Sequence, residues 1–159
     1  MRVYLVRHGQ AKAKEVDPQR GLTEAGRREA EAVARTVARA APDIRHFWHS
    51  GKRRAAETAA IFAAALAGGG RAPVVQEHAG LDPDDPVAPV AAELASFDQE
   101  IAVVGHLPFL DRLTALMVGL DARSDAGIVE FKPSATLCLE RTEERWRILW
   151  FVNYEIGSP

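Results

Sequence analysis

Two histidines and two arginines stand where a phosphate group could be bound and attacked. Arg7 and His8 directly follow one short apolar run, His106 follows another, and Arg54 lies about one turn inside an expected helix. In parallel α/β sheets, ligands gather beyond the carboxyl ends of the strands. Arginine presents a planar fork of donors that matches phosphate oxygens, and a neutral imidazole can form a covalent intermediate. The pattern therefore predicts phosphoryl transfer, which depends mainly on positioning and positive charge.

The elements that must position these side chains are read from hydrophobic periodicity. The expected strands cover residues 3–6, 44–48, 73–76, 101–104, 128–131, 136–140 and 146–152. The expected helices cover residues 23–41, 50–66, 87–94 and 108–117. Strands alternate with helices until a strand-rich tail, which is typical of an α/β fold. We expect a three-layer sandwich with a mostly parallel central sheet flanked by helices, in one domain spanning residues 1–159.

Polar residues at the element ends predict caps and loops. Thr23 and Ser50 have side chains suited to capping the helices that follow them. For Ser50 we expect capping first, although its hydroxyl could also reach a phosphate. The segments 10–21 and 82–86 are expected to be loops, and the glycines at 68–70 to end a helix.

Composition restricts the class of protein. Hydrophobic residues make up 47% and charged residues 26%, which is typical of a folded globular chain, and the net charge of −2 argues against general nucleic-acid binding. Cys138 is the single cysteine, so no internal disulfide can form, and its apolar setting predicts a buried structural thiol. No apolar stretch is long enough to cross a bilayer. We expect a cytoplasmic protein with no membrane and no nucleic-acid partner.

Four segments, in this order, resemble one known family. They are Leu5-Val6-Arg7-His8-Gly9, Leu22-Thr23-Glu24-Ala25-Gly26, Ser50 to Thr58, and Val104-Gly105-His106 with Pro108 close behind. The set is similar to the histidine-phosphatase (phosphoglycerate-mutase-like) superfamily. The short length, Leu81-Asp82-Pro83 and the tail resemble its SixA-type phosphohistidine phosphatases. The resemblance implies a phosphoglycerate-mutase-like fold and a metal-independent phosphatase.

The resemblance also implies residue roles. His8 would be the nucleophile that takes the phosphoryl group and passes it to water, while Arg7 and Arg54 would clamp the phosphate. His106 would donate to the phosphate and to the charge that develops on it. The expected site comprises the catalytic residues Arg7, His8, Arg54 and His106, with Gly9 and Ser50 completing the phosphate-binding set.

Two neighbouring arginines compete for one of these roles. The family's spacing, counted from Ser50, selects Arg54 rather than Arg53. On a helix, adjacent residues point in different directions, so Arg53 is expected to be a surface cation.

No residue stands in an unmistakable general-acid motif. The candidates are Glu77, Asp82, Asp84 and Asp85, most of which are suited to forming turns. The lack of a clear general acid is chemically acceptable for phosphohistidine, because an imidazole leaving group needs less help than an alkoxide. Short loops offer no lid for a small metabolite. Several cations could form a basic rim for acidic partners: Lys12, Lys14, Arg20, Lys52 and Arg53.

The leading hypothesis is a phosphatase that dephosphorylates phosphohistidine on a partner protein. Two alternatives stay open, namely a phosphomonoesterase for small phosphorylated substrates and an inactive phosphate-binding module. No cofactor and no metal are expected, since the arginines beside His8 and His106 would repel a cation. His46, His49 and His78 receive no role, although His49 precedes Ser50 and could border the pocket.

Overall fold

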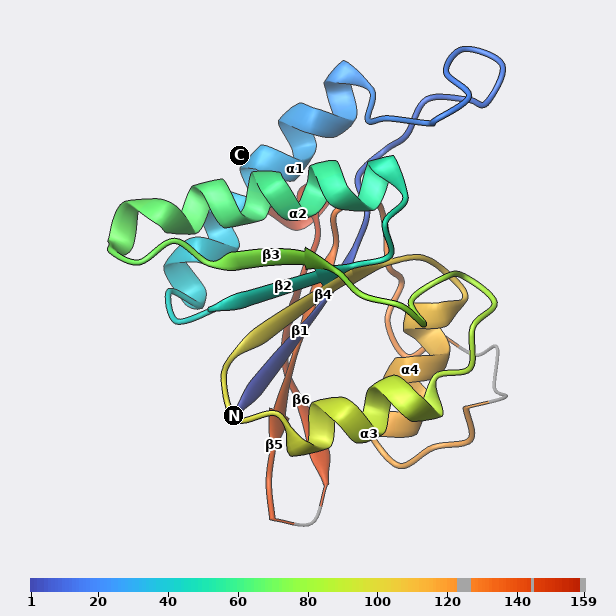
Figure 1. Cartoon of the computed structure of the whole chain (residues 1–159). Helices are drawn as coiled ribbons and strands as arrows, with labels where there is room; N and C mark the ends of the chain where they lie inside the picture. Colours follow the sequence, from blue (N-terminus) through green and yellow to red (C-terminus); the bar gives the residue numbers. More distant parts are fainter. Residues whose placement is uncertain (123–126, 144, 158–159) are drawn as a thin grey trace.

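A six-stranded sheet forms the centre of the computed structural model, which describes residues 1–122, 127–143 and 145–157 (Figure 1). The strand order is β3-β2-β4-β1-β5-β6. The strands are β1 (Arg2–Arg7), β2 (His46–His49), β3 (Val74–Glu77), β4 (Ile101–Gly105), β5 (Thr136–Arg141) and β6 (Trp146–Val152). The first four are parallel to one another, whereas β5 and β6 are antiparallel additions. The mostly parallel sheet is confirmed.

Helices cover both faces of this sheet, as expected for a three-layer sandwich (Figure 1). They are α1 (Glu24–Ala40), α2 (Arg53–Leu66), the 3-10 turn η1 (Ala67–Gly69), α3 (Ala88–Ser96), α4 (Phe109–Met117) and the short α5 (Tyr154–Gly157). One apolar core lies between the sheet and α1 with α2, and a second lies between the sheet and α3 with α4. Thr23 caps α1 as predicted, because its hydroxyl accepts from the Gly26 amide at 2.9 Å.

Strand alternation divides β1 between the two cores. Val3 and Leu5 are buried in the core under α3 and α4, while Tyr4 and Val6 are buried in the core under α1 and α2. A strand buried on both faces must be apolar throughout, which explains the continuous apolar run at this position.

The expected strand over 128–131 is wrong, because this segment forms no strand. Its β-branched and aromatic side chains favour a strand, but β1 is already paired on both sides, by β4 and by β5. The backbone has another partner, since the carbonyl of Phe131 accepts from Nη1 of Arg7 at 2.6 Å. Tertiary contacts therefore override the local preference.

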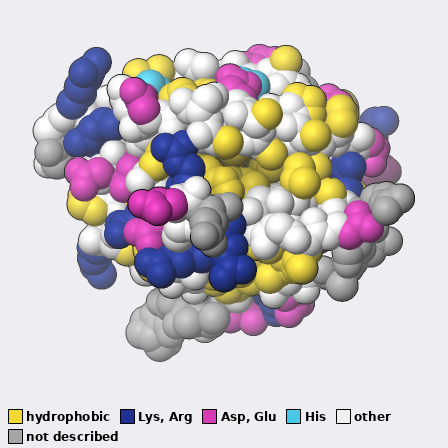
Figure 2. All heavy atoms as spheres, turned by 90° about the horizontal axis from the view of Figure 1, so that it is seen from below, with side chains coloured by type: hydrophobic (Ala, Val, Ile, Leu, Met, Phe, Trp, Pro, Cys, Tyr) yellow, Lys and Arg dark blue, Asp and Glu magenta, His cyan; other side chains and the backbone are white. Residues whose placement is uncertain are grey.

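The face at the bottom of Figure 1, which Figure 2 turns toward the viewer, carries both apolar and charged side chains. Apolar side chains gather in its middle and Lys and Arg side chains cluster on one side of it (Figure 2). Within the described part of the chain, no helix has the length and apolar character needed to cross a bilayer.

Candidate active site

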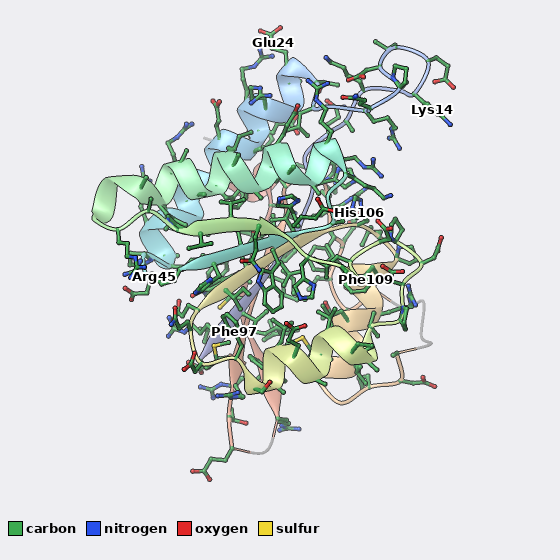
Figure 3. The ribbon with its side chains drawn as sticks, in the orientation of Figure 1. Lys14, Glu24, Arg45, Phe97, His106 and Phe109 are labelled. Carbon is green, nitrogen blue, oxygen red and sulfur yellow. The ribbon has the colours of Figure 1, made fainter. Side chains whose placement is uncertain are left out.

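Sheet register brings the predicted site residues together. β1 and β4 are parallel neighbours in which Arg7 pairs with Gly105, so His8 and His106 leave the sheet side by side. Their ring centroids are 5.0 Å apart. His49 at the end of β2 pairs with Val104, which brings Ser50 to the same edge. Figure 3 shows His106 at this end of the sheet, below the loop that carries Lys14.

The His8 ring is held in one orientation. Its Nδ1 lies 2.7 Å from the backbone oxygen of Gly9. A carbonyl can only accept, so Nδ1 carries the proton and Nε2 keeps its lone pair. The amide of His8 donates to the Gly105 carbonyl at 3.0 Å, and the amide of Gly9 donates to the Thr58 hydroxyl at 2.9 Å. Gly9 therefore acts on the site by orienting His8, since both its backbone polar atoms have protein partners.

Both imidazoles are neutral at pH 7. The pKa of His8 is lowered to about 4, mainly by burial and also by the charges of Arg54, Arg7 and Arg20, against the raising effect of the Gly9 carbonyl. Burial lowers the pKa of His106 to about 3, with His8 and Arg54 adding to the effect. A neutral imidazole is the form that can attack an electrophile.

The pocket contains buried nitrogen atoms that have no hydrogen-bond partner among the described residues. Nε of Arg7, Nε of Arg54 and Nδ1 of His106 are buried and have no hydrogen-bond partner. Burial lowers the pKa of both arginines. Buried donors without partners are costly, so such a cluster is expected to bind an anion. The same cluster repels cations, and no group of three or more potential metal ligands occurs in the described ranges.

Ser50 does not cap α2, so that prediction is wrong. The helix begins later, with Lys52 at the capping position and no side-chain cap. The Ser50 hydroxyl instead forms a 2.6 Å hydrogen bond with Nε2 of His106. The serine therefore holds the His106 imidazole at the pocket, because the parallel pairing of β2 with β4 places the two residues side by side.

Two residues of the family-like segments have roles that the sequence did not reveal. The Thr58 hydroxyl donates to the Arg54 carbonyl at 2.7 Å while accepting from Gly9, so it ties the His8 loop to the helix that carries Arg54. Gly26 is required by close approach, because a Cβ there would lie 2.3 Å from the Gln10 carbonyl oxygen.

Arg20 acts electrostatically on the pocket residues. Its charge lowers the pKa values of both His8 and Arg54, which places its guanidinium close to them. Arg20 adopts a left-handed φ of 51°. Its backbone N–H donates a hydrogen bond to the Asp17 carbonyl, and its side-chain Nε donates one to the Lys12 carbonyl. A strained non-glycine backbone at this point suggests function, but nothing in the sequence distinguishes Arg20 from its neighbours.

The candidate acids have different surroundings. Asp82 influences the pKa values of both Arg54 and His106, and its carboxylate pairs with Lys52 at 3.1 Å. The Asp85 carboxylate accepts from the Asp82 amide at 2.8 Å, and Asp84 lies in the same loop. Glu77 packs against Gly51, where a Cβ would meet its carboxylate at 2.5 Å. Among these candidates, Asp82 is the one whose charge acts on pocket residues.

The remaining histidines lie outside the pocket, and the cysteine is buried. His46 bonds Gln99 at 2.8 Å, and His78 stacks on Trp48 with ring centroids 4.1 Å apart. Nδ1 of His49 accepts from the Gly51 amide at 3.1 Å. Burial raises the pKa of Cys138 to about 12, which confirms a structural thiol.

Comparison with known structures gives the same fold along nearly the whole chain. The protein histidine phosphatase SixA bound to tungstate is 22% identical, with a TM-score of 0.81, covering 98% of this chain and 99% of that one. A phosphohistidine phosphatase SixA assigned in Agrobacterium tumefaciens is 26% identical, with a TM-score of 0.75, covering 95% and 96%. A mycobacterial glucosyl-3-phosphoglycerate phosphatase is 18% identical, with a TM-score of 0.73, covering 94% and 98%.

No curated protein matches the chain. The model of the histidine phosphatase superfamily (branch 1) matches residues 3–82, a span that contains Arg7, His8 and Arg54. This match covers half of the chain, and the architecture of the sheet agrees with it. The chain therefore belongs to the histidine phosphatase superfamily.

Proposed function

We propose that this phosphatase removes phosphoryl groups from phosphohistidine on a partner protein, with His8 as the nucleophile. The observation that carries the proposal is the state of His8. Its ring is neutral, its Nδ1 proton is held by the Gly9 carbonyl, and its Nε2 lone pair is available beside the unsatisfied donors of Arg7, Arg54 and His106.

The reaction follows from this arrangement. Nε2 of His8 attacks phosphorus in line, the bond to the leaving nitrogen breaks, and the leaving nitrogen takes the electron pair. Arg7, Arg54 and Arg20 would hold the phosphoryl oxygens, and His106, oriented by Ser50, would add a further donor. Water then attacks the phosphorylated His8, which releases phosphate and restores the free imidazole.

Two features support phosphohistidine as the substrate. The pocket contains cations and neutral imidazoles, whereas Asp82, the candidate acid whose charge acts on pocket residues, is paired with Lys52. Cleavage of a phosphoramidate needs little help from a general acid, because a phosphohistidine ring that is protonated on its other nitrogen leaves as neutral imidazole. In addition, two SixA structures share the fold over nearly the full length of this chain.

The direct test compares substrates and traps the intermediate. A phosphohistidine peptide, sugar phosphates and nucleotides are offered to the enzyme, and kcat/KM is measured for each. The expected results are preference for the peptide and a phosphoenzyme that is labile in acid and stable in base. Binding of phosphate without any turnover would instead identify an inactive module.

A small-molecule phosphomonoesterase is the second candidate. It is favoured by the likeness to the mycobacterial glucosyl-3-phosphoglycerate phosphatase, which has the same fold. Higher kcat/KM on a sugar phosphate or nucleotide than on the phosphohistidine peptide would establish it and overturn the leading proposal.

A further inference from the structure

A cavity of about 430 Å³ adjoins the reacting centre on the side of α4. Its walls include Arg7, Leu107, Asp111, Val129 and Phe131. Arg7 thus belongs both to the phosphate pocket and to this cavity, and Leu107 directly follows His106. The proposed reaction does not otherwise use the cavity.

Strand alternation places the cavity across the sheet edge from the nucleophile. Leu5 lies in the core under α3 and α4, so the side chain of Arg7 leaves β1 on that same side. The His8 loop is tied to the opposite side, because Gly9 bonds Thr58 of α2. In-line displacement requires the leaving group to depart on the far side of phosphorus from Nε2 of His8.

Asp111 supplies a carboxylate in the cavity. It lies in the first turn of α4, and its charge and that of Arg7 act on each other. Burial raises the pKa of Asp111, and Arg7 opposes that rise. The Arg7 guanidinium donates through Nη1 to the Phe131 carbonyl, which fixes one wall of the cavity.

We propose that this cavity is the leaving-group subsite and that the Asp111 carboxylate accepts a hydrogen bond from the departing imidazole. The proposal rests on the phosphohistidine function and adds the group that recognises the nitrogen side of the scissile bond. Its ligand class is a phosphoramidate whose leaving group carries an N–H donor and positive charge.

The chemistry balances without proton transfer from the enzyme. A phosphohistidine ring protonated on its other nitrogen is an imidazolium. When Nε2 of His8 bonds to phosphorus, the phosphorus–nitrogen bond breaks and its electron pair stays on the leaving ring. That ring keeps its N–H proton, remains hydrogen-bonded to Asp111 and departs as neutral imidazole.

The test measures substrate preference in Asp111 variants. We assay Asp111→Ala and Asp111→Asn with a phosphohistidine peptide and with p-nitrophenyl phosphate. The control variant is Asp43→Ala, which removes a carboxylate that lies far from the cavity. The readout is the ratio of kcat/KM on the peptide to kcat/KM on the nitrophenyl ester. A phenolate leaving group is an anion and cannot donate to Asp111.

We expect this ratio to fall about tenfold or more in Asp111→Ala, as is typical for a lost hydrogen bond between charged groups. In Asp111→Asn, which keeps an acceptor oxygen but no charge, the fall should be smaller, and Asp43→Ala should keep the wild-type ratio. An unchanged ratio in both Asp111 variants would overturn the subsite, because Asp111 would then act only through Arg7 or the fold. A wild-type enzyme that ignores the peptide but hydrolyses the ester would overturn the proposed function itself.

Discussion

The first turn of α2 presents two neighbouring arginines to two different electrostatic regions. Arg54 faces the catalytic pocket, where burial and the charge of Arg20 lower its pKa. Arg53 faces an ion-pair cluster, where Nε bonds the Glu57 carboxylate at 2.8 Å and Nη1 lies 3.9 Å from Asp17. Hydrogen bonding to Glu57 raises the pKa of Arg53.

The difference between these regions lies in whether carboxylates pair with the arginine. In the ion-pair cluster, carboxylates pair with the arginines. The same carboxylates also bind the backbone before α1, since Glu57 accepts from the Leu22 amide and Asp17 accepts from the Gly21 amide. In the pocket, Nε of Arg7 and Nε of Arg54 have no hydrogen-bond partner among the described residues. A site preorganised for an anion keeps its positive charge uncompensated until the anion arrives.

Replacing the proposed nucleophile should have the largest effect on the catalytic side of this comparison. His8→Ala removes the only group placed to form the covalent intermediate in the proposed reaction, so turnover should fall by at least about a thousandfold. Steady-state assays measure the loss, and samples quenched in base should contain phosphoenzyme for the wild type and none for His8→Ala. An unaltered rate in this variant would remove His8 from the mechanism.

Alanine substitution of the two neighbouring arginines tests the comparison itself. Arg54→Ala should lower kcat by about 10²–10³, the usual cost of one preorganised donor. Arg53→Ala should change kcat by less than about twofold, because exposed ion pairs contribute little. Both variants are assayed on the same substrate. Equal losses would show that the two regions are not functionally distinct.

The pH profile should sharpen the description of the pocket. Nε2 of His8 must be unprotonated to attack, and the pKa of His8 in the free enzyme is about 4. Protonation of His8 should therefore leave kcat/KM unchanged down to about pH 4 and lower it below that pH. The folded pKa values of His8 and His106 lie below the ordinary 6.5, so the unfolded chain binds more protons in this range. These two groups should therefore reduce the free energy of unfolding as pH falls from 6.5 towards 4. A kcat/KM limb with a midpoint near 6.5 would contradict the buried neutral ring.

The smallest catalytic effect is expected in the ion-pair cluster. Glu57→Gln weakens the bonds to Arg53, Arg27 and the Leu22 amide, so the free energy of unfolding should fall by about 1 kcal/mol. Thermal or urea unfolding measures this change. The loss in kcat should stay below that of Arg54→Ala, and a larger loss would mean that the cluster takes part in catalysis.

Much of the fold was predictable because its elements carry strong local signals. The apolar runs at β1 and β4 are strands buried on both faces, and Thr23 caps α1 as its side chain predicts. The strand predicted at 128–131 is absent because the neighbouring β1 is already paired on both sides and the Phe131 carbonyl accepts from Arg7 instead. The prediction that Ser50 caps a helix is wrong because its hydroxyl forms a hydrogen bond with His106, 56 residues away in the sequence.

The sequence by itself indicated the family and the mostly parallel character of the sheet, and it predicted the four principal site residues, because motif spacing and periodicity are local properties. Only the tertiary structure decided that the charge of Arg20 acts on His8, that Ser50 holds His106, and that Asp111 shares a cavity with Arg7. These relations depend on sheet register and on which face of β1 each side chain leaves. Such long-range geometry arises only when strands distant in sequence pair with one another.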